Sequence, residues 1–407
     1  MSRGRVQGFQ KDRLTQILAV RRLTQVQLAA MVGVSPSTIN KWRFGTQLPE
    51  HEALERLASV VNVTPEWFTR TPGPKLPPPL FRSNAKALVS AMEMFHARLE
   101  WVQEIVDALS EYVDFPHLNL PARNYATIEE ISDEEIERAA CECRDLWRLG
   151  RSVIQDISLS AEGAGVILVR EETGVAQIDG LSSWSEAQGR PLILLSADKD
   201  NGYRGRFDLA HEIGHVILHR SIKRSTKRTM DSARYSLMEK QAHRFAGAFL
   251  LPAETFATEV PVPPTLDDLL LLKRRWGVSV AAMIMRLRAL DILSEDGALM
   301  LYKRRSARWG VKSEPGDGDL KPEKPRLLRR TIELLVEEKV MPLEGIHRYF
   351  GLAETDIEAL VGLPTGYFHR NDNVVQFSRL RSVIENSQAY DAKDKTKIMH
   401  FRVPRKT

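Results

Sequence analysis

The chain has 407 residues, of which 43% are hydrophobic and 27% are charged. This balance is typical of a globular protein with room for two or three domains. No stretch approaches the roughly 18 uncharged apolar residues of a membrane span. The basic N-terminus has no apolar run behind it, so neither a membrane protein nor a secretory signal is expected.

The net charge of +5 is unevenly distributed along the chain. Residues 1–75 carry 11 Lys and Arg against 5 Asp and Glu, whereas acidic and basic residues almost balance in the remainder. A basic first segment predicts a polyanionic partner for that part of the chain. The two cysteines, Cys141 and Cys143, are two apart on a predicted helix and do not bridge readily. We therefore expect reduced thiols and a cytoplasmic protein.

From Gln10 to Arg70 the sequence predicts five short helices. Thr24 is placed to cap the second helix, which ends at Gly33. Ser35 is placed to cap the third, residues 36–44, which has an apolar inner face and a polar outer face. A helix, a tight turn and a polar helix form the helix-turn-helix pattern, whose second helix enters the DNA major groove.

Residues 23–45 read Leu-Thr-Gln-x-x-Leu-Ala-x-x-x-Gly-Val-Ser-x-x-Thr-Ile-x-x-Trp-x-x-Gly. This pattern resembles the Xre/Cro-type repressor family. The resemblance implies a double-stranded operator DNA as partner, a homodimer, and DNA-facing side chains at Gln25, Ser35, Ser37, Thr38 and Lys41. Arg43 departs from the family, which often has Glu there; it adds a phosphate contact or removes a structural ion pair. The alternative is a helical protein-interaction domain.

Residues 71–80 are rich in proline, which favours extended polyproline II, so we predict a semi-rigid linker after the first domain. Two amphipathic helices, residues 84–112 and 132–149, are predicted next. Short strands are then predicted at residues 165–169, 175–178 and 191–195.

A predicted loop at residues 196–205 leads into a helix that contains His-Glu-Ile-Gly-His, an instance of the H-E-x-x-H pattern. Residues four apart lie on one face of a helix, so His211 and His215 can aim both imidazoles at one point. Two nitrogens so placed can share Zn²⁺, and Glu212 can hold the water on the metal. The alternative is a chance match in an amphipathic helix.

A third metal ligand is expected on the next predicted helix, residues 236–252, because catalytic zinc usually keeps three protein ligands and one open position. Glu239 follows His215 at a distance that allows a loop and an antiparallel return, and it is the favoured ligand. The alternatives are His243, one turn later on the same face, and His219, which a straight helix carries about 6 Å past His215, away from the metal.

The pattern His-Glu-Ile-Gly-His-x-x-x-His, followed by Glu-x-x-Ala-x-x-Phe-Ala and Leu-Leu-Pro, resembles the ImmA/IrrE family of zinc metallopeptidases over residues 163–293. The resemblance implies Glu212 as the catalytic acid/base, Glu239 as the third ligand, and a narrow substrate, often a repressor. His243 departs from the family, which more often has Asn or Asp. The groups that support the ligands, with His219 and His243 as candidates, therefore stay open.

Several segments lie between and beyond the two predicted metal-binding helices. Residues 220–228 carry five basic residues and are predicted to be a solvated loop, with guidance of an acidic partner or DNA as the alternative. The helical pair 266–276 and 279–293 superficially suggests a second helix-turn-helix, but its second helix offers little polar surface, so we predict core. A linker at residues 313–325 and two or three small helices at residues 327–360 follow, with a polar, basic tail beyond Asn371.

The predicted fold is therefore mostly α. A five-helix helix-turn-helix domain (residues 1–70) and the linker (71–80) precede an α+β zincin-like metallopeptidase domain with a small sheet (81–300). Residues 301–407 form a linker and a small helical C-terminal region.

Three functions fit these motifs. The first is a DNA-bound regulator with an active zinc endopeptidase, whose substrate or partner is a protein such as a repressor or toxin encoded by a neighbouring gene. The second is a repressor or antitoxin whose zincin domain is a non-catalytic sensor or partner-binding module. The third is a peptidase whose first domain serves only protein docking. We favour the first.

Overall fold

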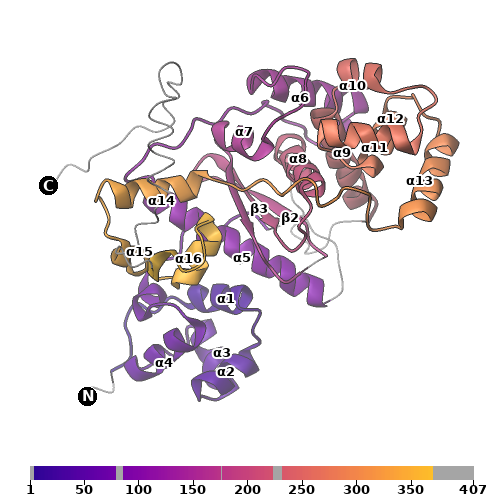
Figure 1. Ribbon diagram of the computed structural model, residues 1–407. Helices are drawn as coiled ribbons and strands as arrows, with labels where there is room; N and C mark the ends of the chain where they lie inside the picture. Colours follow the sequence, from indigo (N-terminus) through magenta and orange to yellow (C-terminus); the bar gives the residue numbers. More distant parts are fainter. Residues whose placement is uncertain (1–3, 79–85, 176, 223–231, 370–407) are drawn as a thin grey trace.

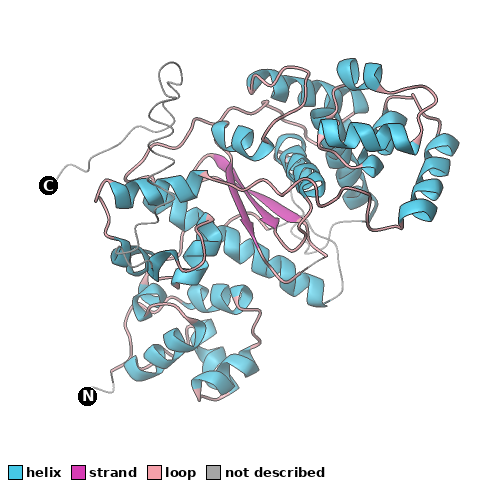
Figure 2. Ribbon diagram, in the orientation of Figure 1, coloured by secondary structure: helices cyan, strands magenta, loops and turns pink. Residues whose placement is uncertain are grey.

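The computed structural model describes residues 4–78, 86–175, 177–222 and 232–369. This part of the chain contains sixteen α-helices and one three-stranded sheet (Figures 1 and 2), in agreement with the predicted mostly α fold. None of the described helices combines the length and apolar character needed to cross a membrane.

The first helices form where the caps predict them. Thr24 and Gln27 make a reciprocal capping box, Gly33 ends the second helix with a φ of 76°, and Ser35 caps the third. The prediction of five helices is confirmed, except that the fifth is a 3-10 helix. The elements are α1 (Lys11–Val20), α2 (Gln25–Val32), α3 (Pro36–Phe44), α4 (His51–Val61) and η1 (Pro65–Thr69).

The proline-rich segment lies against α5 (Lys86–Leu109). The Gly73 N–H donates to Glu104, the Gln103 amide donates to the Pro74 carbonyl at 2.6 Å, and Leu76 is buried. Arg13 of α1 also binds Glu104, at 2.7 Å. The first domain and α5 are therefore joined by packing and charge as well as by the chain. Residues 79 and 80 of the predicted linker are outside the described residues.

A small mixed sheet follows, in the order β1-β3-β2. β1 pairs parallel with β3, and β3 pairs antiparallel with β2. The prediction of a strand at residues 175–178 is wrong. Here the Ile178 N–H donates to the Val175 carbonyl, and the Val175 N–H donates to the Asp198 carboxylate, so the backbone turns instead of joining a ladder. The strands are β1 (Ile167–Glu171), β2 (Gly180–Ser185) and β3 (Arg190–Ser196).

The helix that carries the H-E-x-x-H pattern, α8 (Gly202–His219), begins inside the segment predicted as a loop. The Asn201 side chain accepts the Arg204 N–H and caps the helix. Gly202 and Gly205, which lie in the predicted loop, are therefore part of α8. The helical pair predicted to be core, residues 266–276 and 279–293, buries Met283, Ile284 and Leu287 of its second helix, as expected. The other helices of this region are η2 (Ile128–Glu130), α6 (Asp133–Leu146), α7 (Ile157–Gly163), α9 (Ser232–Leu250), α10 (Ala253–Glu259), α11 (Leu266–Trp276), α12 (Val280–Ala289) and α13 (Glu295–Trp309).

The predicted linker at residues 313–325 is held to the preceding helices by carboxylates. Glu314 accepts the backbone N–H groups of Val280 and Ala281 at the start of α12, and Glu323 accepts that of Ser158 in α7. Such contacts satisfy helix N-termini with negative charge. The last helices are α14 (Leu327–Glu337), α15 (Leu343–Phe350), α16 (Glu354–Val361) and η3 (Tyr367–His369). The predicted tail beyond Asn371 is outside the described residues.

The sheet separates two hydrophobic cores. Leu181 of β2 belongs to the core that also contains the first helices, α5 and the C-terminal helices. Trp184, on the opposite face of the same strand, belongs to the core formed by α6 to α13. The C-terminal helices lie between the first domain and the sheet (Figure 1), and Val63 forms a backbone bridge with Leu352. Cys141 and Cys143 are free thiols.

Candidate metal centre

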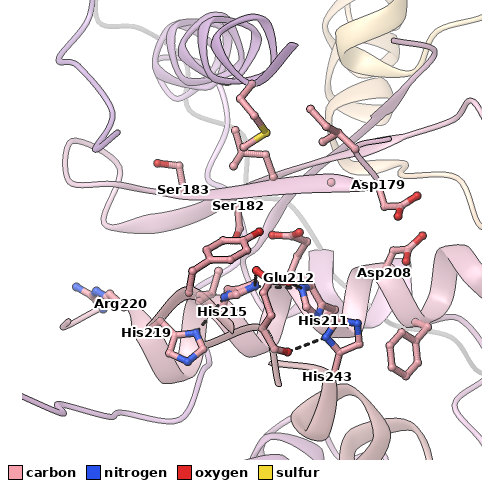
Figure 3. Close-up of a pocket in the computed structure, with 18 of the residues that line it drawn as sticks. Asp179, Ser182, Ser183, Asp208, His211, Glu212, His215, His219, Arg220 and His243 are labelled. Atoms are coloured by element: carbon pink, nitrogen blue, oxygen red, sulfur yellow. Dashed lines mark hydrogen bonds and ion pairs between the residues drawn. The ribbon is translucent and has the colours of Figure 1, made fainter. Parts of the chain in front are cut away.

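Three predicted ligands converge where α8 and α9 pack together. The Nε2 atoms of His211 and His215 are 3.0 Å apart, and the helical repeat places these two residues on one face of α8. Glu239 of α9 places Oε2 3.4 Å from Nε2 of His211 and Oε1 3.4 Å from Nε2 of His215. Figure 3 shows both imidazoles on the same side of α8. The ligand atoms of the three residues lie within 4.8 Å of one another.

This cluster fits zinc. Two ligands at the usual zinc distance of roughly 2.1 Å are about 3.4 Å apart at a tetrahedral angle, and the separations of 3.0 and 3.4 Å are close to that value. Two neutral imidazoles and one carboxylate are also a ligand set of catalytic zinc, which leaves one position open. His211, His215 and Glu239 would hold the metal.

The charges of the cluster favour an ionised Glu239. Burial alone would raise the pKa of this carboxyl, but its bonds to His211 and His215 lower it far below its usual range. Conversely, burial would lower the pKa of His211, and the bond to Glu239 together with the neighbouring Glu212 raises it. The negative charge of Glu239 is thus held beside the two imidazoles, where a divalent cation would be stabilised.

His219 and His243 lie outside the three-ligand cluster. His219 is buried, with Nδ1 3.0 Å from Nδ1 of His215 and Nε2 3.0 Å from the Gln241 amide oxygen. Burial and the neighbouring His215 lower the pKa of His219 to about 3, so it is neutral. His243 is exposed, its Nδ1 lies 2.7 Å from the Glu239 carbonyl, and its ring centroid is 4.4 Å from that of His211.

Glu212 is buried beside the cluster, under the first residue of β2. A Cβ on Gly180 would meet the Cγ and Oε1 atoms of Glu212 at 3.2 Å. Glycine therefore lets β2 approach α8 closely enough to cover this carboxylate. Glu212 is well placed to accept a proton, since no ion pair holds it among the described residues and it faces the cavity next to the ligands.

Tyr235 is a residue of the site that the sequence reasoning missed. It lies one helical turn before Glu239 on α9, and both side chains line the same cavity. Burial, followed by the charge of Glu239, raises the pKa of Tyr235. A phenol that stays protonated can donate to the ligand oxygen or to a neighbouring oxyanion. The spacing of four residues on one helix is the signal that could have found it.

The cluster lines a cavity of about 260 Å³ between α8, α9 and β2. Asp179 and Asp208 lie at one end and Arg220 at the other, with Glu212, His211 and His215 between them (Figure 3). One edge of β2 pairs with β3, and no other described strand pairs with its second edge. That free edge can hydrogen-bond an extended peptide beside the cluster.

The predicted DNA-facing residues lie on or next to α3, which is remote from the metal cluster (Figure 1). Ser37 and Lys41 are exposed, and Gln25 is half-buried. Ser35 and Thr38 are also structural, because the Ser35 hydroxyl accepts the Thr38 N–H and lies 2.9 Å from the Thr38 hydroxyl. The half-buried Arg43 reaches Thr15 of α1 at 3.4 Å, a contact within the domain.

Comparison with protein families divides the chain in the same way. Residues 161–288 match the model of the IrrE N-terminal-like domain, a family of M78 peptidases. Residues 20–68 match the helix-turn-helix model. No curated protein matches the chain. The chain therefore joins a helix-turn-helix domain of the Xre type to an IrrE N-terminal-like peptidase-family domain.

Proposed function

We propose that the protein is a DNA-bound transcriptional regulator whose zinc centre is an endopeptidase for one specific regulatory protein. The observation that carries the proposal is the position of Glu212: a carboxylate without an ion-pair partner among the described residues, beside a three-ligand cluster, in a cavity bordered by the free edge of β2. A purely structural zinc site has four protein ligands and needs neither a cavity nor a nearby base.

The chain's own groups supply binding and proton transfer. When bound, zinc polarises a peptide carbonyl and lowers the pKa of water. The free edge of β2 holds the peptide extended. Glu212 takes the proton of the attacking water and returns it to the leaving amine. The Tyr235 phenol donates toward oxygen at the ligand cluster.

The regulatory half of the proposal rests on α3 and its exposed Ser37 and Lys41. A single domain of this size binds DNA weakly, so we infer a homodimer on a two-fold operator. The helix-turn-helix brings the peptidase to the promoter, and cleavage of a bound or neighbouring regulatory protein changes transcription there.

The test compares Glu212→Gln with His215→Ala. Glu212→Gln keeps the ligands and loses the base, so we expect zinc to be retained and the cleavage rate to fall on the order of 100-fold or more. Both variants are expressed in cells with the protein products of neighbouring genes, and target proteins are followed by mass spectrometry. Accumulation of an uncleaved target with both variants supports the endopeptidase.

A different result would identify the sensor function instead. If Glu212→Gln responds like the parent while His215→Ala fails, only the metal scaffold matters and the proposed catalysis is wrong. Purified parent and Glu212→Gln proteins with equal zinc content provide the control that a lost response is not lost metal.

A further inference from the structure

We infer, on the basis of the proposed endopeptidase function, that Arg220 makes the cleft selective for peptides with an acidic side chain about two residues from the scissile bond. Arg220 follows the last residue of α8 and lines the same cavity as the ligands. It is the only lysine or arginine among the described residues that line this cavity.

The cavity has acidic side chains at one end and a basic side chain at the other. Asp179 and Asp208 lie at the end opposite Arg220 (Figure 3). The acidic end already has cations: Lys199 and Arg204 bind Asp179 at 2.7 and 2.6 Å. Arg220, in contrast, has no carboxylate within ion-pair distance in the described part of the chain. A peptide carboxylate would therefore supply the missing partner at that end.

Arg220 is also held in place for such a contact. Its guanidinium carbon lies 3.2 Å from the ring centroid of Trp184. Stacking on an indole occupies the flat face of the guanidinium, whereas its N–H groups point outward along the edge and can still donate hydrogen bonds. These donors can bind a carboxylate in a bidentate manner. Trp184 is 8% exposed and packed in the core, so it forms a rigid support for the cation.

The spacing gives the position of the acidic residue. Arg220 is five residues beyond His215, which places its backbone about 7.5 Å along the helix from that ligand. An extended peptide advances about 3.3 Å per residue. A peptide lying along β2 and α8 with its scissile bond at the ligand cluster therefore brings its second residue from that bond opposite Arg220.

The experiment uses the full-length, zinc-loaded protein and a random decapeptide library, with cleavage products sequenced by mass spectrometry. We expect Asp and Glu to be enriched about tenfold one to three residues from the cut, on one side only. Arg220→Glu should remove this enrichment and replace it with Lys and Arg. Lys303→Glu, an exposed residue of α13 outside the cavity, makes the same change in net charge and should leave the preference unchanged.

A peptide-binding experiment distinguishes a wrong inference about Arg220 from a wrong endopeptidase proposal. Zinc-loaded Glu212→Gln is incubated with the same library, and retained peptides are identified with Arg220 and with Arg220→Glu in that background. If nothing is cut but acidic peptides are retained through Arg220, the proposed function fails and only the acidic selectivity of the cleft stands. Cleavage or retention without an acidic preference, a preference that Arg220→Glu does not change, or no retained peptide at all overturns the inference.

Discussion

Arg21 and Asp356 lie 335 positions apart and form an ion pair in which Nη2 and Oδ2 are 2.5 Å apart. Arg21 follows α1 of the helix-turn-helix domain, and Asp356 lies on α16. Arg98 of α5 binds the same carboxylate at 2.6 Å and also binds Glu171 at the end of β1. A charge network with three buried members thus connects the DNA-binding domain to the sheet that borders the metal cluster.

The first prediction concerns the stability that this network provides. Burial alone raises the pKa of Asp356, but Arg21 and Arg98 lower it below the ordinary 3.8. Stability from a depressed pKa is fully present above that value and is lost as pH falls through the folded-state pKa. We expect Asp356→Asn to lower the free energy of unfolding by about 3 kcal/mol at pH 7, with a smaller difference below pH 3.8.

Denaturant titrations at several pH values measure this effect. Glu338→Gln removes an exposed carboxylate just after the end of α14 and serves as the control, with a change within about 0.5 kcal/mol. Equal stabilities of parent and Asp356→Asn at pH 7 would show that the network contributes nothing.

The second prediction concerns the metal. We expect about one zinc per chain, and His215→Ala or Glu239→Ala should weaken zinc binding by more than about 100-fold, since loss of a residue that only orients a ligand costs about 10- to 100-fold. His51→Ala is the matched control and should leave zinc affinity unchanged, because His51 is exposed on α4 and does not line the cavity. Elemental analysis and competition with a chelator give the affinities. Parent protein purified without zinc that also fails to bind added zinc contradicts the site.

The third prediction concerns Tyr235. Tyr235→Phe keeps the ring and removes the phenol hydroxyl one helical turn from Glu239 in the same cavity, so we expect zinc affinity to fall about 10-fold if this hydroxyl supports the ligand. Tyr302→Phe removes a phenol that donates to the Ala281 carbonyl outside the cavity, and it should leave zinc affinity unchanged. Chelator competition compares the two variants. If they behave alike, the phenol does not support the ligand.

The fourth prediction concerns DNA. Lys41→Ala should weaken binding at all sequences and reduce the slope of log affinity against log salt by about 1, because one phosphate contact is lost. Ser37→Ala should weaken binding without changing the slope, since serine carries no charge. Lys303→Ala is a control cation remote from α3. Fluorescence anisotropy over a salt series measures both quantities, and an unchanged Lys41→Ala curve refutes the assignment of α3 as the DNA-reading helix.

Local chemistry determined much of this protein. The capping residues Thr24 and Ser35 and the turn at Gly33 predicted the helix-turn-helix because caps and glycine turns act over a few residues. The placement of His211 beside His215 follows from the helical repeat alone. The sequence also indicated Glu239, through its distance from the first pair and through the family resemblance, before the structure brought its carboxylate to within 3.4 Å of both nitrogens.

Tertiary packing decided the rest. A strand was predicted at residues 175–178, but Asp198, more than twenty residues later, accepts the Val175 N–H and turns the chain. The contact of Arg220 with Trp184, and the ion pair of Arg21 with Asp356, join segments whose separation no periodic pattern reports. Helical periodicity relates residues within a few turns, whereas these contacts depend on how the sheet, α5 and the C-terminal helices pack, which only the folded chain specifies.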